Sequence, residues 1–524
     1  MSHRTPDTDR TIFRMQYKCA ALLLTLLILL FVNITPAAAA GDSIKALIKK
    51  AARLDRHGSH VEAEKLLRQA LTVDPGRSET KVALAFTLAK QRRLIEAYDL
   101  VFPVAKAEPE NARAYSVLGT TLLYAGRFAE ARPILNTAIR LDRRQHLAWA
   151  GYGMLDFYEN DIGESIENLR EAVLQRPNEP DYLFALAQVA ARAEQYQWAA
   201  DNYKEFLRVA HISDADRRER IKGLIAFLHY LGQAGTLYAP GGKENTTVPF
   251  QLIGNRPVIP VRINGRDEPL RFVLDTGSGI SVMSTETARR LKVSPITRGG
   301  YARGIGGDGK FEIVYGLLRE IEIGEVELHN VPIYLRTFHN DADNIDGYIG
   351  LALISKFLTT IDYGNQTFAL TRKDAAVRTF DNDQTRSLPL RLTSSGFLSG
   401  EVTLQGLDGP LNFIVDTGAS VSVISERVAG VETIMPFIND EKMRVFGSAG
   451  IKEDVPTYLL PSVRFGSHTR TDIMAVALDL DLINEASGWE QSGILGGNFL
   501  KNYRLTFDFK NSKVIFADIK RENE

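Results

Sequence analysis

The sequence predicts a multidomain protein in which an all-α solenoid of helical hairpins is followed by two all-β lobes that form a pseudo-dimer. Small residues recur with a period of 34 residues in the first half of the chain. The second half consists of short apolar runs with strand periodicity. A thirteen-residue segment occurs there twice, as FVLDTGSGISVMS at 272–284 and FIVDTGASVSVIS at 413–425, with seven identical positions and an offset of 141 residues. A chain of 524 residues is also too long for one hydrophobic core.

The N-terminal segment, residues 1–40, has the features of a secretory signal peptide. Four cations precede the apolar run Cys19–Val32, and Ala37–Ala40 supply the small residues of a cleavage site. The run is shorter than the roughly twenty residues that a membrane span needs, so we expect cleavage after Ala40, with an uncleaved anchor as the alternative. The mature protein would then be periplasmic or secreted, without a membrane span. Cleavage would also remove Cys19, the only cysteine, and with it disulfide and thiolate chemistry.

The composition argues against several classes of function. A formal net charge of -1 provides no basic field for nucleic acid. The histidines show no metal-ligand spacing, and no glycine-rich loop stands between a strand and a helix as a phosphate site requires. We therefore expect no nucleic-acid partner, no metal and no cofactor.

The 34-residue period indicates a helical repeat array. Small residues follow one another at that spacing, at Ala63, Ala97, Ala131, Ser165 and Ala199, and prolines stand twelve residues after three of them, at Pro75, Pro109 and Pro177. Small side chains let antiparallel helices approach closely, and a proline ends the second helix of a pair. The pattern resembles the tetratricopeptide repeat over residues 44–234, including a final cap helix expected to face solvent. Such an array implies a groove for a peptide or protein partner, with a plain spacer as the alternative.

The second half is expected to contain two matching lobes. A stretch rich in Gly and Pro at 235–247 is expected to be a linker. Apolar runs at 258–263 and 270–274 then flank Asn264-Gly265, a strong hairpin signal, and the same unit returns near 402–415. The duplication continues to DGYIGL at 346–351 and SGILGG at 492–497. We expect a first lobe at 248–376, a polar linker at 377–386 and a second lobe at 387–521.

Each lobe carries one carboxylate at the end of an apolar strand, Asp275 in the first and Asp416 in the second. Water attacks an amide slowly because both the nucleophile and the leaving nitrogen need proton transfers. Two carboxyl groups about 3 Å apart cannot both ionise, so they share one proton. The ionised group can then take a proton from a bound water while the other polarises the scissile carbonyl. One lobe alone cannot supply this pair.

The two lobes resemble aspartic proteases of the pepsin and retropepsin clan. Two lobes in one chain, Asp-Thr-Gly-Ser in the first copy and the DGYIGL and ILGGNFLKNY stretches are pepsin-like features. The compact lobes and Asp-Thr-Gly-Ala in the second copy are retropepsin-like features. The resemblance implies a site made of Asp275, Asp416 and a water, with no metal, cofactor or covalent intermediate.

The resemblance also implies supporting roles for residues around the two aspartates. Thr276 and Thr417 would interlock across the lobe interface. Glycines after them would allow tight turns whose N–H groups face the carboxylates, at Gly277 and Gly418. Four residues would pack behind the loops, namely Ile349, Gly350, Leu495 and Gly496. Segments near 248–253, 367–371, 388–392 and 513–517 would form a sheet that joins the lobes.

One difference between the copies predicts which carboxylate is the base. Ser278 can donate a hydrogen bond to Asp275, whereas Ala419 offers Asp416 no such donor. A hydrogen bond to the charged form favours that form. We therefore expect Asp275 to be the ionised base and Asp416 to be the protonated partner.

Two glycine-rich segments are candidates for the hairpins that close the substrate cleft in this family, RGIGGDGK at 303–310 and FGSAGIKE at 446–453. A plain surface hairpin is the alternative for each. The expected function is thus an aspartic endopeptidase that acts on a peptide or protein, with the repeats recruiting the substrate or a partner. The main alternative is a non-catalytic scaffold whose lobes bind peptides. A third arrangement, in which each lobe pairs with its twin from another chain, leaves the oligomeric state open.

Overall fold

The computed structural model describes residues 35–212, 215–307, 309–339, 343–373 and 387–519. The expected signal segment lies outside these residues except for 35–40, and the expected linker at 377–386 lies wholly outside them. None of the helices in the described ranges combines the length and the apolar character that crossing a membrane requires. Contacts divide the chain into two compact units, residues 1–107 and 108–524.

Helical hairpins occupy the first part of the chain, as the 34-residue period predicts. The first unit contains α2 (Thr35–Arg56), α3 (His60–Val73), α4 (Ser78–Lys90) and α5 (Leu94–Ala107). The second unit begins with α6 (Ala112–Tyr124), α7 (Phe128–Leu141), α8 (His146–Tyr158), α9 (Ile162–Gln175), α10 (Pro180–Arg192), α11 (Tyr196–Val209) and α12 (Ala215–Leu231).

The residues that carry the period are fully buried at the helix contacts, namely Ala63, Ala97, Ala131, Ser165 and Ala199. The one serine is accommodated because its Oγ donates to the carbonyl oxygen of Gly153, 2.7 Å away on the facing helix. Each of the three prolines stands two residues after a helix ends, beyond α3, α5 and α9. Steric limits at close helix contacts and the missing proline N–H therefore explain the repeat.

The first lobe is a nine-stranded sheet that closes on itself. Its elements are β1 (Ala239–Gly242), β3 (Gln251–Ile253), β4 (Arg256–Ile263), β5 (Leu270–Leu274), β6 (Ser281–Ser284), α13 (Thr285–Arg290), β7 (Pro295–Arg303), β8 (Lys310–Ile323), β9 (Val326–Arg336), β10 (Gly347–Ile349) and α14 (Leu351–Ile354). The strand order β9-β6-β10-β5-β4-β8 is completed by pairing of β8 with β9, which makes a small barrel. The expected hairpin turn is present between β4 and β5, with positive φ at both Asn264 and Gly265.

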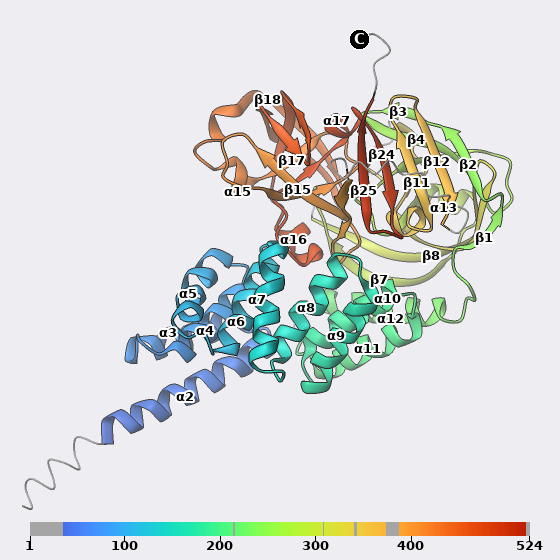
Figure 1. Ribbon diagram of the computed structural model, residues 1–524. Helices are drawn as coiled ribbons and strands as arrows, with labels where there is room; N and C mark the ends of the chain where they lie inside the picture. Colours follow the sequence, from blue (N-terminus) through green and yellow to red (C-terminus); the bar gives the residue numbers. More distant parts are fainter. Residues whose placement is uncertain (1–34, 213–214, 308, 340–342, 374–386, 520–524) are drawn as a thin grey trace, which may run out of the picture. The chain divides into compact units, whose positions relative to one another are not determined.

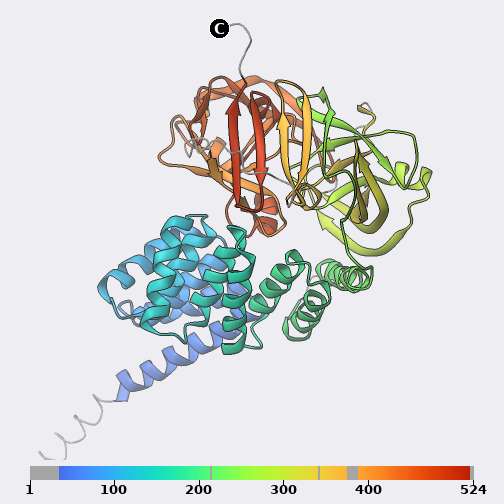
Figure 2. The ribbon, with the colours of Figure 1, turned by 45° about the vertical axis from the view of Figure 1, so that its right-hand side comes forward.

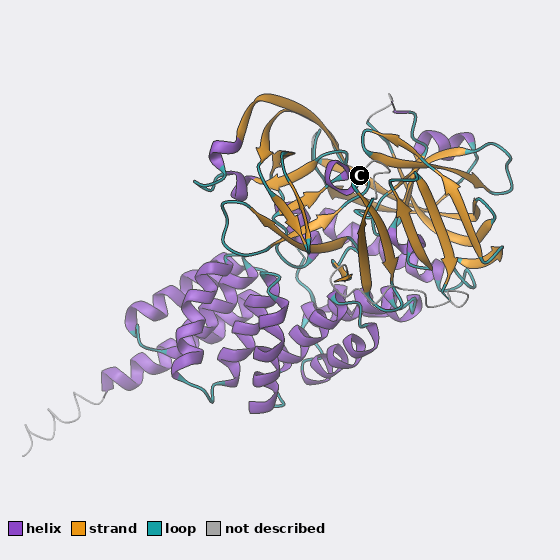
Figure 3. Cartoon of the chain, turned by 45° about the horizontal axis from the view of Figure 1, so that its top comes forward, coloured by secondary structure: helices purple, strands orange, loops and turns teal. Residues whose placement is uncertain are grey.

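The second lobe repeats this plan in a ten-stranded sheet. Its elements are β14 (Arg391–Leu392), β15 (Leu398–Leu404), β16 (Leu411–Val415), β17 (Ser422–Ser425), α15 (Glu426–Ala429), η3 (Met435–Phe437), β18 (Ile438–Gly447), β19 (Gly450–Leu460), β20 (Val463–Phe465), β21 (His468–Arg470), β22 (Ile473–Leu478), α16 (Asp481–Ser487), β23 (Gly493–Leu495) and α17 (Gly497–Leu500). Strands make up most of both lobes, and their helices are short (Figure 3). The predicted class of helical repeats followed by two β lobes is confirmed.

A six-stranded antiparallel sheet joins the lobes. In order it contains β13 (Ser387–Pro389), β25 (Lys513–Asp518), β24 (Tyr503–Asp508), β11 (Phe357–Asp362), β12 (Thr367–Arg372) and β2 (Asn245–Pro249). Figure 2 shows β24 and β25 of the second lobe beside β11 and β12 of the first. At the junction Thr360 pairs with Thr506, and their Oγ1 atoms lie 3.1 Å apart. The two halves thus share a hydrogen-bonded ladder as well as a core.

The expectation of a linker at 235–247 is wrong for most of this segment, because the chain forms the strands β1 and β2 there. β1 pairs with β9, and β2 pairs with β12 at the edge of the joining sheet. Proline is tolerated on an edge strand because one side of that strand needs no N–H donor. A Gly- and Pro-rich composition therefore does not exclude pairing at this position.

The final helix of the array, α12, does not face solvent as expected, because it packs against β7 of the first lobe. A Cβ added at Gly223 would lie 2.4 Å from Gly299 Cα, so the helix and strand backbones are in close contact. The rings of Phe227 and Tyr315 stack with centroids 4.4 Å apart. The helix α12 therefore packs on two sides, against α11 and against β7 of the first lobe (Figure 1).

The turns between repeat helices in the second unit also contact the second lobe. Trp489 is fully buried, with its ring centroid 5.0 Å from Phe128 and 4.4 Å from Tyr158. Beside it, the Glu490 N–H donates to the Tyr124 carbonyl oxygen at 2.9 Å. Repeats α6 to α12 and the lobes therefore form one packed body, which the sequence did not predict.

Candidate active site

Asp275 and Asp416 occupy equivalent positions in the two lobes, each directly after a buried strand. Asp275 follows β5, and its N–H donates to the Ile349 carbonyl oxygen at 3.0 Å; Asp416 follows β16, and its N–H donates to the Leu495 carbonyl oxygen at 3.0 Å. Both acceptors end a short strand that runs parallel to the strand before the aspartate. The same local hydrogen bonding therefore places one carboxylate in each lobe.

The two aspartate loops approach each other so closely that only glycine fits at their tips. A Cβ added at Gly277 would lie 2.4 Å from Asp416 Cγ, and one added at Gly418 would lie 2.7 Å from Asp275 Cγ. The Gly277 N–H donates to Asp275 Oδ1 at 2.9 Å, and the Gly418 N–H donates to Asp416 Oδ1 at 2.7 Å. The carboxyl groups are also close enough to shift the pKa of each other. The chain thus brings its two predicted carboxylates together as a dyad.

Thr276 and Thr417 interlock across the lobe interface, where both are fully buried. Thr276 Oγ1 donates to the Val415 carbonyl oxygen at 2.6 Å and accepts from the Thr417 N–H at 3.1 Å. Thr417 Oγ1 donates to the Leu274 carbonyl oxygen at 2.7 Å and accepts from the Thr276 N–H at 3.2 Å. Each hydroxyl therefore ties its own loop to the strand that precedes the other aspartate.

The residues expected behind the loops lie there. Ile349 and Leu495 are buried. The N–H groups of the following glycines donate to serine hydroxyls, from Gly350 to Ser281 and from Gly496 to Ser422, each at 3.1 Å. A Cβ at either glycine would lie within 2.7 Å of the backbone that follows the aspartate loop. These contacts hold the two loops against rigid strands.

Burial and mutual repulsion shift the pKa of the dyad. Burial, and then the neighbouring Asp416 carboxyl, raise the pKa of Asp275 well above its usual value of 3.8. Burial also raises the pKa of Asp416, but the Gly418 N–H, the Asp275 carboxyl and the Ala419 N–H oppose this shift. These contacts favour a higher pKa for Asp275 than for Asp416.

This order is the reverse of the one expected from Ser278. The Ser278 hydroxyl donates to the Ile280 carbonyl oxygen at 2.7 Å, so its proton is not available to Asp275. In the other loop, the Ala419 N–H donates to Asp416 Oδ1 at 3.2 Å, which gives that carboxylate a second backbone donor. Because hydrogen bonds to the charged form favour it, the backbone makes Asp416 the ionised member. The hydrogen bond on which the expectation of Asp275 as base rested is therefore absent, and the backbone donors favour Asp416 as base instead.

The raised pKa of Asp275 predicts a loss of stability with rising pH. An aspartate whose folded pKa exceeds its unfolded value contributes stability that is complete below about pH 3.8 and is lost as pH rises through the folded pKa. Asp275→Asn removes this contribution, so we expect a smaller fall in the urea midpoint between pH 4 and pH 7 than in the wild type. The exposed Asp267→Asn is the matched control. A wild-type fall no larger than that of Asp275→Asn would contradict the prediction.

Both predicted cleft hairpins exist, and their tips meet. The first is formed by β7 and β8, and the second by β18 and β19. The Ala449 N–H donates to the Ile305 carbonyl oxygen at 2.8 Å, and the Gly307 N–H donates to the Ile451 carbonyl oxygen at 3.1 Å. Ile305 also packs against an apolar cluster of the second lobe. These hairpins are therefore tied to each other in the structure, unlike plain surface hairpins.

One residue near the dyad was missed at the sequence level, the arginine that ends β9. Arg336 is close enough to Asp275 for its charge to lower the pKa of that carboxyl. The signal was present in the sequence, because the duplicated strand ends in Leu478 where the first copy has this cation. A charged residue at the end of an otherwise apolar strand could have been noticed by aligning the two copies.

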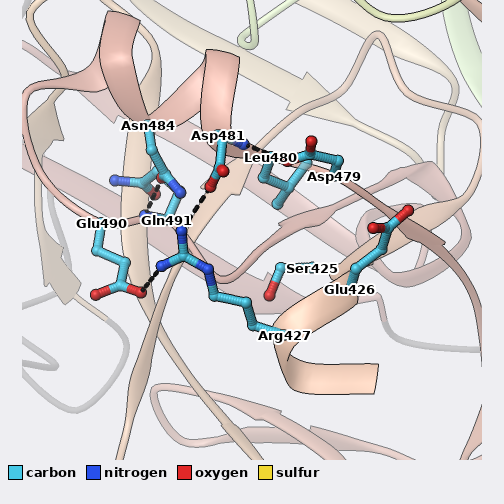
Figure 4. A pocket seen from close by; sticks show the side chains of 9 residues that line it. All are labelled: Ser425, Glu426, Arg427, Asp479, Leu480, Asp481, Asn484, Glu490 and Gln491. Atoms are coloured by element: carbon cyan, nitrogen blue, oxygen red, sulfur yellow. Dashed lines mark hydrogen bonds and ion pairs between the residues drawn. The ribbon is translucent and has the colours of Figure 1, made fainter. Parts of the chain in front are cut away.

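Other polar clusters lie apart from the dyad. Among the described residues, the group with metal-compatible spacing is Glu320, Glu327 and His329, on β8 and β9. A pocket of about 160 Å³ on the second lobe is lined by Ser425, Glu426, Arg427, Asp479, Leu480, Asp481, Asn484, Glu490 and Gln491 (Figure 4). Its arginine, Arg427, is already paired with Asp481 at 2.6 Å and Glu490 at 3.2 Å. Neither group contains a residue of the aspartate loops.

Comparison with known families agrees with this geometry. Residues 259–353 and 400–499 match the family model described as aspartyl protease, and residues 56–119 match the tetratricopeptide repeat model. The two segments of the first match contain Asp275 and Asp416 respectively. The expected resemblance to both families is confirmed. No curated protein sequence is similar enough to this chain to count as a match.

Similar solved structures include three proteins that resemble the helical part. They are a thermophilic TPR protein of Thermus thermophilus (21% identity, 35% of this chain and 99% of that chain, TM-score 0.31), MamA of Desulfovibrio magneticus (21%, 32% and 95%, TM-score 0.24) and PilF of Pseudomonas aeruginosa (18%, 37% and 90%, TM-score 0.28).

Proposed function

We propose that this protein is an aspartic endopeptidase that hydrolyses peptide bonds with a water activated by Asp275 and Asp416. The observation that carries the proposal is the dyad itself: two buried carboxyl groups, one from each lobe, that are brought together by the close approach of the two loops and held by the reciprocal contacts of Thr276 and Thr417. Two such groups share one proton and supply a base and an acid at the same point. The aspartyl protease match over both lobes supports the same reaction class.

In the proposed reaction each carboxyl group takes up one proton and gives up one proton. The Asp416 carboxylate takes a proton from a bound water, whose oxygen forms a bond to the scissile carbonyl carbon. Asp275 gives its proton to the carbonyl oxygen, which yields a neutral tetrahedral diol. Asp416 then protonates the amide nitrogen, the C–N bond breaks, and a diol hydroxyl returns its proton to Asp275. The dyad ends with one proton, as it began.

The repeats are proposed to recruit a protein substrate or partner. The tetratricopeptide repeat match over residues 56–119 supports protein–protein interaction as the general role of the repeats. Because α6 to α12 are packed against the lobes, a protein bound to these repeats would be held at a fixed position relative to the dyad. The N-terminal sequence further suggests that the protein acts after export, in the periplasm or outside the cell.

The proposal is tested by digesting a diverse peptide library with the purified full chain from pH 3 to pH 8. The wild type is expected to cleave, whereas the double variant Asp275→Asn/Asp416→Asn is expected to be inert. Asp267→Asn, an exposed aspartate, controls for loss of charge. If the wild type binds peptides without cutting them at any pH, the non-catalytic scaffold is the better description. Cleavage by the double variant would exclude the dyad as the source of activity.

A further inference from the structure

Arg336 lies where the first lobe meets the hairpin of the second. It ends β9, and its guanidinium lies over the ring of Phe311 with its carbon 4.2 Å from the ring centroid. One of its Nη atoms donates to the carbonyl oxygen of Ser448, at the tip of the β18–β19 hairpin. Stacking on an aromatic face fixes the plane of the guanidinium and leaves its edge free to bind planar acceptors.

Within the described ranges, the acidic group whose charge acts on Arg336 is Asp275 of the dyad. Among the residues that the structure describes, no carboxylate forms an ion pair with it, and its Nε is buried without a hydrogen-bond acceptor. Arg256, by contrast, is paired with Asp343. Burying a guanidinium with an unsatisfied donor costs free energy unless a ligand supplies the acceptor.

The Ser448 carbonyl oxygen, which accepts a hydrogen bond from Arg336, must move when a peptide enters. The tips of the two hairpins are joined by hydrogen bonds between Ala449 and Ile305 and between Gly307 and Ile451. If these hairpins close the substrate cleft, as the resemblance to aspartic proteases implies, a peptide reaches the dyad only when these bonds break, and the Ser448 carbonyl belongs to the tip that would move. Opening therefore releases a guanidinium donor close to Asp275.

The equivalent position in the second lobe is apolar. Arg336 pairs with Ser284 in the first lobe, and Leu478 pairs with the duplicated serine, Ser425, in the second. Leu478 is buried in an apolar cluster with Val423, Val455, Val476 and Leu480. The cation at the end of β9 therefore belongs to the first lobe alone, and the second lobe has a buried aliphatic side chain at the same place.

We propose that Arg336 binds the carboxylate side chain of an Asp or Glu residue beside the scissile bond. This specificity rests on the proposed endopeptidase function. A carboxylate is the ligand that matches a planar, stacked guanidinium through two parallel hydrogen bonds. Peptides with an acidic residue beside the cut are then the preferred substrates.

The test compares matched fluorogenic peptides that carry Glu or Gln beside the scissile bond. For the wild type we expect kcat/KM to be about 10- to 100-fold higher for the Glu peptide, as charged hydrogen bonds allow. Arg336→Met should bring this ratio close to one. Arg336→Lys should retain part of the preference. Arg262→Met, an exposed arginine paired with Glu322, is the matched control.

Each result decides the proposal. A merely structural role for Arg336 would lower the rates on both peptides equally, and equal wild-type rates on Glu and Gln peptides would overturn the charge preference. Binding of the same labelled peptides to Asp416→Asn separates this inference from the proposed function. If nothing is cleaved but Glu peptides bind more tightly in an Arg336-dependent manner, the site is upheld and the endopeptidase is not. Absence of both effects would reject Arg336 as a carboxylate site.

Discussion

Asp416→Asn is expected to lower kcat by about 10²- to 10⁴-fold on any peptide that the wild type cleaves. Asp416 accepts two backbone hydrogen bonds, from Gly418 at 2.7 Å and Ala419 at 3.2 Å, and these favour its ionised form. An asparagine amide fits the same space but cannot take a proton from water. The variant should therefore bind peptide while failing to turn it over.

The measurement is kcat and KM with one cleaved peptide, together with peptide binding by fluorescence anisotropy. Asp408→Asn is the matched control, because Asp408 is exposed and stands in the same lobe eight residues before the dyad residue. The expected pattern is a loss in kcat with little change in binding for Asp416→Asn and no loss for Asp408→Asn. If Asp416→Asn kept a rate within a few-fold of the wild type, Asp416 could not be the base.

Thr417→Val is expected to destabilise the lobes by about 2–5 kcal/mol, because it leaves two buried backbone groups without partners. The valine has nearly the shape of threonine, but it removes the hydroxyl that accepts from the Thr276 N–H and donates to the Leu274 carbonyl oxygen. Both groups lie at the lobe interface, where Thr276 and Thr417 are fully buried. Loss of these contacts should also misplace the carboxylates and lower activity.

Thr417→Ser distinguishes the hydroxyl from the methyl group, since serine keeps the hydrogen bonds and loses only packing. Urea unfolding of the wild type, Thr417→Val and Thr417→Ser should place serine closer to the wild type than valine. The opposite order would show that the methyl group, and not the hydrogen bonding, holds the interface. Thr276→Val is a second, independent test, because the Thr276 hydroxyl makes the equivalent pair of hydrogen bonds from the other lobe.

Elements whose structure depends on nearby residues were predicted well. The 34-residue spacing identified the buried helix contacts, because a close helix crossing admits only small side chains whatever surrounds it. The Asn264-Gly265 turn was also correct, because positive φ is a local requirement. The two copies of Asp-Thr-Gly carried enough information to identify both members of the dyad.

Predictions that depended on a distant partner were less successful. The segment at 235–247 was expected to be a linker, yet it pairs with β9 and β12, strands that lie more than 80 residues away. The cap helix α12 was expected to face solvent, but Phe227 stacks on Tyr315. Nothing in the composition of these segments reveals the surface that covers them.

The sequence alone determined the repeat array, the duplication and the two carboxylates, because each is encoded in the spacing or local geometry of neighbouring residues. Only the tertiary structure showed which carboxylate the surrounding hydrogen-bond donors favour in its ionised form. Ser278 was the visible candidate donor, but its hydroxyl donates to Ile280, and the deciding donors are backbone N–H groups that every residue except proline carries. It also decided the surroundings of Arg336, since a charge acquires its partners, or lacks them, only when segments distant in the chain fold around it.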